Sequence, residues 1–327
     1  EHYGSLLQYF TGSKEHNVAL RALAQKKGLS LSEYGFKRGD EELLCRTEEE
    51  VYGALGLPWI PPELREDRGE IQAAQENRLP RLVCREDIRG DLHAHTDWSD
   101  AAATIQEMAS AAQALGYEYL VISDHTHSLG VANGLDEARL REQRRAIDAL
   151  NKHLQGFTVL QGAEVEIRAD GSLDFPDEVL RGLDVVIASV HSALRQDRET
   201  ITERVLRAVR NPLVNVLGHP SGRLLGQREA TNLDLDRVIQ EAAATGLILE
   251  VNATPNRLDL DDAHVRSAIQ AGAALAINSD AHSTAGLETM MYGVAAARRG
   301  WAEKKDVVNT LPLAQLRQRL RRGERAG

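Results

Sequence analysis

The chain has 327 residues, 42% of them hydrophobic, and a formal net charge of −10 at pH 7. This length is enough for one large domain and a small one, and the acidic balance argues against a large basic groove for nucleic acid. No apolar run approaches the roughly 18 residues of a membrane span, and the first residues lack the pattern of a signal peptide. We therefore expect a cytoplasmic protein, and its two cysteines, Cys45 and Cys84, are expected to be ordinary thiols.

The first 57 residues predict a small α/β unit. Ser13 can cap a helix over about 14–27, which Gly28 would end. The segment "LPWIPPELREDRGE" (57–70) contains three prolines, which exclude a regular helix at 58–62. We interpret 58–85 as a linker that ends in a short helix. The last segment, "LRQRLRRGERAG" (316–327), is basic and is expected to form a solvated helix face and tail.

From residue 86 onward, apolar runs that resemble strands alternate with amphipathic stretches that resemble helices. The seven runs are 88–95, 117–125, 157–167, 183–191, 213–219, 246–253 and 273–282, and the helical patterns between them include 104–115, 135–154 and 262–272. This alternation predicts a parallel sheet. Seven such units favour a closed or nearly closed (β/α) barrel over an open sheet.

Polar residues follow the ends of these runs, where parallel α/β folds gather their chemistry. The candidates are His93, His95, Asp100, His125, Glu164, His191, His219, Asp280 and His282. Taken singly, His191 could be an ordinary histidine, Glu164 could pair with an arginine, and Asp280 could cap a helix. Six of the 11 histidines at corresponding strand ends indicate a metal site instead. Imidazole and carboxylate ligands for two or three ions suit Zn²⁺, Mn²⁺ or Fe²⁺ and argue against Ca²⁺.

The motifs "DLHAHTDWSD", "SDH", "GAEVEI", "SVH", "GHP" and "SDAH" occur in that order and resemble those of the PHP (polymerase and histidinol phosphatase) superfamily. The resemblance covers roughly 88–327 and implies a distorted (β/α)7 TIM-like barrel with a trinuclear metal centre. One ion would be held by His93, His95, Glu164 and Asp280, the second by Glu164, His191 and His219, and the third by Asp100, His125 and His282. Glu164 would bridge the first two ions. Ala101 departs from the glycine that the family often has there, which concerns the loop and not a ligand.

Two further segments, 9–35 beginning "YFTGSKEHNV" and 48–74 beginning "EEEVYGALGL", resemble the end of a bacterial family X DNA polymerase before its PHP domain. This resemblance implies a thumb remnant over 1–57, a linker over 58–85 and a PHP domain over 86–327. Tyr9, Phe10, Asn17 and Arg21 match positions that contact the base pair and the nucleotide in that family. The catalytic aspartates of the polymerase would precede residue 1, so we expect packing and capping roles for these four residues, with upstream polymerase domains as partners.

The resemblance implies a metal-dependent phosphodiester hydrolase, a 3′→5′ exonuclease that processes DNA 3′ ends in repair near the nucleoid. Glu164, Asp100 and His191 would serve catalysis, Arg223 would clamp the phosphate, and Asp124 would orient an imidazole. One alternative is a phosphomonoesterase that removes a 3′ phosphate or acts on a metabolite such as histidinol phosphate. Another is a metal-filled scaffold that supports the polymerase without catalysis.

Overall fold

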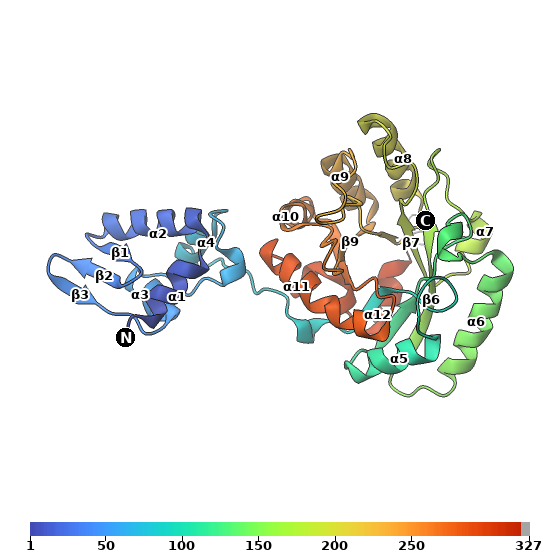
Figure 1. Ribbon diagram of the computed structural model, residues 1–327, viewed down its shortest axis with the longest axis horizontal. Helices are drawn as coiled ribbons and strands as arrows, with labels where there is room; N and C mark the ends of the chain where they lie inside the picture. The colour runs from blue at the N-terminus through green and yellow to red at the C-terminus, as the bar shows by residue number, and fades with distance from the viewer. Residues whose placement is uncertain (322–327) are drawn as a thin grey trace. The chain divides into compact units, whose positions relative to one another are not determined.

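The computed structural model describes residues 1–321, so the end of the basic segment, 322–327, lies outside the described part. The chain divides into two compact units, Glu1–Arg81 and Leu82 onward, and each is described by itself (Figure 1). Among the described residues, no helix combines the length and apolar character that crossing a membrane requires.

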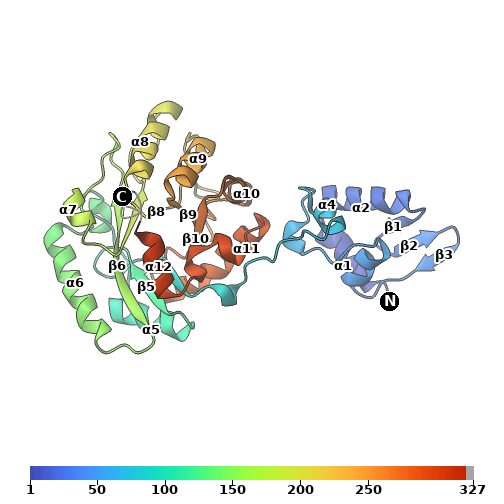
Figure 2. The ribbon, with the colours of Figure 1, turned by 180° about the vertical axis from the view of Figure 1, so that it is seen from behind.

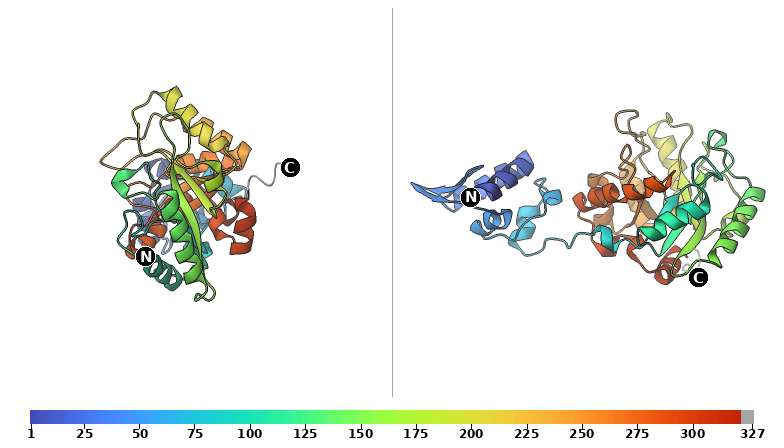
Figure 3. Two further views of the ribbon diagram at one scale, coloured as in Figure 1. Left: turned by 90° about the vertical axis from the view of Figure 1, so that its right-hand side faces the viewer. Right: turned by 60° about the horizontal axis from the view of Figure 1, so that its bottom comes forward.

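The N-terminal unit contains four α-helices and a three-stranded antiparallel sheet in the order β1-β2-β3. Its elements are α1 (Tyr3–Thr11), α2 (Lys14–Lys26), β1 (Ser30–Ser32), β2 (Gly35–Arg38), β3 (Glu41–Leu43), α3 (Glu48–Ala54), the 3₁₀ turn η1 (Pro62–Leu64) and α4 (Glu70–Gln75). Helix α2 begins as predicted, because the Ser13 side chain accepts a hydrogen bond from the amide of His16. Helix α2 contacts β1, and the right panel of Figure 3 shows the blue helices of this unit beside its strands.

The segment predicted as a linker belongs to this unit up to Arg81. Ile60 and Leu64 are fully buried, and the buried Arg65 side chain donates to the Ile60 carbonyl and to both carboxylate oxygens of Glu48. The prolines do exclude a regular α-helix at 58–62, and η1 is the only helical turn there among the described residues. Irregular backbone can thus still bury its side chains, and the bounds predicted for the linker stay a prediction.

Tyr9, Phe10, Asn17 and Arg21 match positions that contact the base pair and the nucleotide in family X polymerases. Their surroundings in this unit differ from one another. Asn17 fastens the end of α1, since its amide donates to the Tyr9 carbonyl and accepts from Gln8. Phe10 is 73% exposed, so the packing role expected for it is wrong in this chain. Arg21 is also exposed.

The second unit is a barrel of seven parallel strands with helices outside, as predicted (Figure 2). The strands are β4 (Gly90–Ala94), β5 (Tyr119–Ile122), β6 (Thr158–Glu166), β7 (Val185–Ser189), β8 (Val216–Leu217), β9 (Ile248–Asn252) and β10 (Ala274–Asn278). The α-helices are α5 (Ile105–Ala114), α6 (Glu137–Asn151), α7 (Asp177–Leu180), α8 (Arg198–Arg210), α9 (Leu235–Thr245), α10 (Asp262–Ala271), α11 (Met290–Arg299) and α12 (Leu313–Leu320). The 3₁₀ turns are η2 (Arg85–Asp87), η3 (Gly130–Ala132), η4 (Thr284–Thr289), η5 (Lys304–Asp306) and η6 (Val308–Thr310).

The strands pair in chain order from β4 to β10, so the sheet is continuous except where its first and last strands meet. At that seam, an isolated bridge joins Ala94 to Ala281, and Asn278 accepts a hydrogen bond from the Leu92 amide. The seam explains why the barrel is distorted: strand pairing there is short. It also brings the ends of β4 and β10 together.

Two apolar layers hold the barrel. Side chains such as Leu92, Val121, Ile187 and Ile248 fill its interior, while others such as Leu120, Val186 and Leu249 pack against the outer helices. This explains why the strands appear as continuous apolar runs, because both of their faces are covered. Leu316 and Leu320 of α12 belong to the interior cluster, so α12 covers the end of the barrel where the strands begin.

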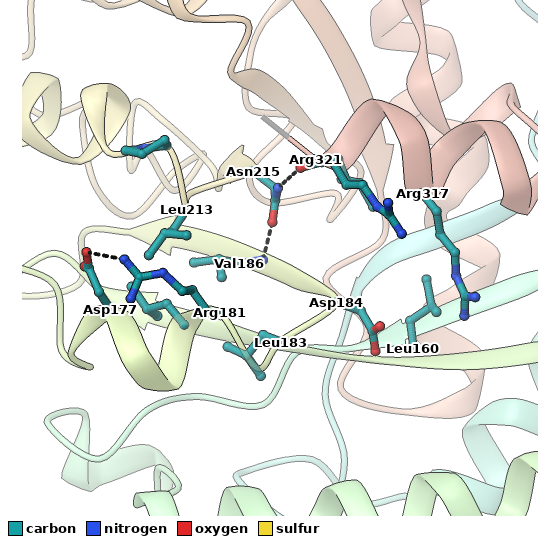
Figure 4. Close-up of a pocket in the computed structure, with 13 residues that line it drawn as sticks. Leu160, Asp177, Arg181, Leu183, Asp184, Val186, Leu213, Asn215, Arg317 and Arg321 are labelled. Atoms are coloured by element: carbon teal, nitrogen blue, oxygen red, sulfur yellow. Dashed lines mark hydrogen bonds and ion pairs between the residues drawn. The ribbon is translucent and has the colours of Figure 1, made fainter. Parts of the chain in front are cut away.

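A hollow of about 750 Å³ lies beside α12 at this same end of the barrel. Its wall includes Leu160, Val186 and Arg317, as Figure 4 shows. Asn215 ties the wall together by accepting from the Val186 amide and donating to the Leu320 carbonyl. The candidate site residues follow the opposite ends of the strands, so this hollow is separate from them.

Candidate metal centre

Glu164 lies near the end of β6 and is surrounded by imidazole rings. Its Oε2 atom is 3.4 Å from His93 Nε2, 3.5 Å from His95 Nε2 and 3.0 Å from His125 Nδ1. Its Oε1 atom faces the other way, 3.3 Å from His191 Nε2 and 2.8 Å from His219 Nε2. The two carboxylate oxygens therefore serve two different groups of histidines, which is the arrangement that a bridging ligand needs.

The first predicted group gathers at the barrel seam. His93 lies in β4 and His95 directly follows it; both are completely buried, and Asp280 follows β10. Asp280 Oδ1 lies 3.1 Å from His95 Nε2 and 3.6 Å from His93 Nε2. Asp280 and His219 both have positive φ angles, 52° and 26°. Such angles are uncommon outside glycine. At these two positions the chain therefore adopts an unfavourable backbone conformation that directs the side chain toward the cluster.

The other predicted group, Asp100, His125 and His282, lies closer to solvent. Asp100 Oδ2 is 3.6 Å from His125 Nε2, and Asp100 Oδ1 is 3.5 Å from His282 Nε2. The side chains of Asp100 and His282 are 32% and 41% exposed. The cluster therefore runs from a closed end at His93 to an open end at His282.

All nine predicted ligands lie in this one cluster. Within it, three sets of residues each bring their ligand atoms together, and some residues belong to two of these sets. The ligand atoms of His93, His95 and Asp280 converge within 4.8 Å of one another, as do those of His95, Asp100, His125 and His282, and those of His125, Glu164 and His191. His95 and His125 thus belong to two sets each. The predicted assignment gives each of them to a single ion, and that assignment stays a prediction.

Several buried polar atoms of the cluster have no partner in hydrogen-bond geometry among the described residues, although some, such as His125 Nδ1 and Glu164 Oε2 at 3.0 Å, lie close together. They include His93 Nε2, both ring nitrogens of His95, His125 Nδ1, His219 Nδ1 and Glu164 Oε2. A buried polar atom without a partner costs about 1–3 kcal/mol, so this many in one place require a compensating group. Imidazole nitrogens and a carboxylate oxygen are a fitting donor set for divalent cations such as Zn²⁺ and Mn²⁺.

The charges of the cluster also indicate a site for divalent cations. Burial would raise the pKa of Glu164, but the neighbouring His191, His125 and His93 hold it well below its ordinary value. Burial would lower the pKa of His191, yet the carboxylates of Glu164 and Glu166 raise it to about 10. The carboxylates thus remain ionised and demand positive charge beside them. Since an imidazole must be neutral to ligate, metal binding here would release protons.

Two glutamates that were not among the predicted site residues hold the ligands in place. Glu250 of β9 is fully buried; one of its oxygens is 2.7 Å from His93 Nδ1, and the other accepts from the His219 amide at 2.6 Å. Glu166 is 2.9 Å from His191 Nδ1. These contacts leave the Nε2 atoms of His93 and His191 facing Glu164. The sequence did contain a signal for Glu166. It is a charged residue in an apolar strand and lies two positions from Glu164, so both side chains are on the same face.

Two further predictions differ from the structure. Arg223 does not point a free guanidinium at the cluster; it donates to the carbonyls of Arg257 and Leu258 and pairs with Asp261 at 3.3 Å. Asp124 accepts hydrogen bonds from Thr96, Ser99 and Gln143, and within residues 1–321 no imidazole donates to it. The polar atoms of both residues are already occupied by protein groups. These contacts stabilise loops around the cluster.

Comparison with known families agrees with this geometry. The PHP domain family matches residues 91–254, about half of the chain. The chain belongs to the PHP domain family. A second family, described as the DNA polymerase beta thumb, matches residues 6–66. The recognition of a family X polymerase thumb joined to a PHP domain is thereby confirmed, and so is the distorted barrel expected for the PHP fold.

Several known proteins are similar to this PHP chain. It is 42% identical, over 99% of its own length and 57% of the relative's, to the DNA polymerase/3′-5′ exonuclease PolX of Bacillus subtilis. It therefore spans less than two thirds of that relative. A probable phosphatase of Acetivibrio thermocellus is 34% identical over 50% of this chain and 64% of its own length. A histidinol phosphate phosphatase structure from Lactococcus lactis covers 64% of this chain and 93% of its own, with a TM-score of 0.47 and 15% identity.

Proposed function

We propose that this chain is a metal-dependent phosphoesterase that removes nucleotides from DNA 3′ ends as a 3′→5′ exonuclease. The observation that carries the proposal is Glu164, whose two oxygens face two groups of buried imidazoles with unpartnered nitrogens. Two or three divalent ions, Mn²⁺ or Zn²⁺ in our proposal, would lower the pKa of a bound water towards roughly 7 and neutralise charge on phosphoryl oxygens.

The residues of the chain divide the work by position. Glu164, His191 and His219 would bind one of the ions at the buried side of the cluster. Glu166 fixes the orientation of the His191 ring. Asp100 and His282 lie at the exposed end, where a phosphoester can approach without crossing the barrel. The protein thus offers a closed side that fixes the ligands and an open side that admits substrate.

The DNA substrate is supported by the N-terminal unit and by the relative. The thumb match and 42% identity to a DNA polymerase/3′-5′ exonuclease make a DNA end a better fit than a metabolite. We propose upstream polymerase domains as partners of the chain for the same reason. A phosphomonoesterase is the second candidate, favoured by the 34% identity to a probable phosphatase over half of the chain.

The test is an end-processing assay with the whole chain. We would incubate it with Mn²⁺ and 5′-labelled single-stranded or gapped DNA, beside an oligonucleotide with a 3′ phosphate. The variant Glu164→Gln should lose activity, and Glu178→Gln, an exposed glutamate on α7, is the matched control. A ladder of shortened products that requires Glu164 supports the exonuclease.

Other results would redirect the assignment. Loss of the terminal phosphate alone would identify the phosphomonoesterase. Intact DNA in every lane, with metals shown to be bound by elemental analysis, would contradict both hydrolases and leave the scaffold.

A further inference from the structure

We infer that Arg204 is a positioning residue for the metal centre, and that it holds the His191 imidazole in its ligating orientation through the carboxylate of Glu166. The inference rests on the proposed phosphoesterase function and deepens it. Arg204 lies on α8, and its side chain is 1% exposed. Its Nη2 atom is 3.5 Å from Glu166 Oε1, and Glu166 Oε2 is 2.9 Å from His191 Nδ1. The carboxylate of Glu166 therefore lies between the guanidinium and a predicted ligand.

The Glu166 carboxylate gathers donors from the residues that follow β7. It accepts from the His191 amide at 3.0 Å, and from the amide and the hydroxyl of Ser192 at 3.1 and 2.6 Å. A carboxylate that faces Nδ1 keeps the ring proton on that side and leaves Nε2 free to ligate. The Nε2 atom of His191 is 3.3 Å from Glu164 Oε1, so its free side faces the cluster.

The Arg204 guanidinium also fastens the two chain segments that leave the cluster here. Its Nε atom donates at 3.1 Å to the carbonyl of Ile167, the residue after Glu166. Its Nη1 atom donates at 2.9 Å to the carbonyl of Ser192, the residue after His191. The N–H donors of a guanidinium lie in one rigid plane. The end of β6 and the segment after β7 are thus held at a fixed spacing by one side chain.

The burial of a charge on α8 needs a reason. Ile201 and Val205 of the same helix contribute apolar side chains to the core of the barrel. An arginine in such a place loses its hydration, which costs several kcal/mol unless the charge is paired and hydrogen-bonded. Arg204 offsets this cost with the contacts described above, and it places its positive charge beside the carboxylate that orients His191. The position therefore favours a role toward the ligand.

A purely structural role would make Arg204 a brace for the two carbonyls, and the two roles predict different results. A brace affects the stability of the barrel independently of Glu166. A positioning residue affects metal binding, and only while the Glu166 carboxylate is present. The variants are Arg204→Gln, which keeps an N–H donor without the charge, and Arg204→Lys, which keeps the charge without the fork. Arg210→Gln is the matched control, because Arg210 is 51% exposed on the same helix and pairs with Glu241.

The measurement is the affinity of the whole chain for Mn²⁺, from competition with a chelating dye, in a double-mutant cycle with Glu166→Gln. The absorption spectrum of the Co²⁺-loaded chain adds a readout of ligand geometry, which a change in stability alone would leave unaltered. We expect Arg204→Gln to weaken metal binding about 10- to 100-fold and to alter the spectrum, and Arg204→Lys to do so less. In the presence of Glu166→Gln, the Arg204 variants should add little to the loss.

Two results would overturn the inference. One is an affinity like that of the parent and of Arg210→Gln in the folded Arg204 variants. The other is a loss that simply adds to that of Glu166→Gln, which would assign Arg204 to the brace. If one Arg204 variant does not fold, the other takes its place in the cycle, because both disturb the fork. If the affinities follow the expected pattern but the parent hydrolyses no phosphoester, the proposed function fails and the role of Arg204 toward the metal stands.

Discussion

Glu250 shows how one buried carboxylate can fix two ligand residues at once. It is close to the His93 ring and to the His219 amide, and it also accepts from the side chains of Asn252 and Asn278. His93 lies on one side of Glu164 and His219 on the other. The position of both groups therefore depends on a residue that is not itself a candidate ligand.

Replacing Glu250 by glutamine should disturb both groups. One side-chain oxygen becomes an amide that cannot accept from its present donors, so we expect metal affinity to fall about 10- to 100-fold. Competition with a chelating dye would measure this, with Glu142→Gln, exposed on α6, as the control. Equal affinities for the two variants would show that Glu250 does not position the ligands.

Arg65 presents a comparable case in the N-terminal unit. Its side chain is fully buried, and it forms a two-pronged pair with Glu48, whose side chain is 10% exposed. Arg65→Met would leave the Glu48 carboxylate buried without its partner, so we expect about 3–5 kcal/mol less stability for residues 1–81. Hydrogen exchange of peptides from this unit would reveal the loss, whereas peptides from the barrel should exchange as before.

The carboxylates of Glu48 and Glu70 make the same unit sensitive to acid. Burial would raise the pKa of each, but hydrogen bonds from Arg65 to Glu48 and from His16 to Glu70 lower them below the ordinary value of 4.5. A folded pKa below the unfolded one gives stability that is present above the unfolded pKa and is lost as pH falls through the folded value. We expect this unit to lose stability below about pH 4.5, and Glu48→Gln to flatten that dependence in denaturant titrations at several pH values.

At the scale of elements, the shortest strand of the barrel carries one of the most constrained positions. Strand β8 has two residues, and Gly218 follows it directly, before His219. A Cβ atom on Gly218 would lie 2.5 Å from Ser189 Oγ and 2.9 Å from Ile187 Cγ2 on the neighbouring strand. There is consequently no room for a side chain between β7 and β8 at this point.

Gly218→Val should therefore push β7 and β8 apart and displace His219. We expect a loss of about 1–3 kcal/mol, typical of overpacking, together with fewer bound ions. Thermal unfolding and metal content would test both effects. Gly130→Val is the control, because a Cβ atom there meets nothing within 4 Å; similar behaviour of the two variants would contradict the steric argument.

The sequence predicted the barrel well because its strands and helices differ in period and its strand ends carry rare residues. All seven predicted runs contain a strand. Eight of the nine predicted ligand residues fall in the three converging sets, and His219 joins them through its contact with Glu164. Tertiary partners were harder to predict. Arg223 looked free in the sequence, and only the fold shows that its donors meet the carbonyls of 257 and 258. The prolines of 58–62 suggested a linker, since nothing local reveals that Ile60 and Leu64 are buried.

At the scale of the whole molecule, the two units should respond differently to removal of metal. The candidate ligands all belong to the barrel, and the N-terminal unit has its own core. Ions that bind only the folded barrel stabilise it by about 2.7 kcal/mol at a hundredfold excess over the dissociation constant. We expect a chelator to lower the melting temperature of the barrel alone, and added Mn²⁺ to restore it, in calorimetry of the whole chain. A parallel shift in both transitions would contradict this expectation.

The seam of the barrel gives the candidate ligands a second task. His93 and His95 lie in and directly after the first strand, and Asp280 and His282 follow the last one. The two pairs are about as far apart in the chain as Leu92 and Asn278, which are separated by 186 residues. Ions bound there would link the first and last strands of the barrel, which backbone hydrogen bonds join only weakly. A substitution at one of these four positions would then open the ring as well as remove a ligand. Activity lost in such a variant would combine a damaged catalyst with a smaller population of closed barrels, and rates from these positions should be compared per closed molecule.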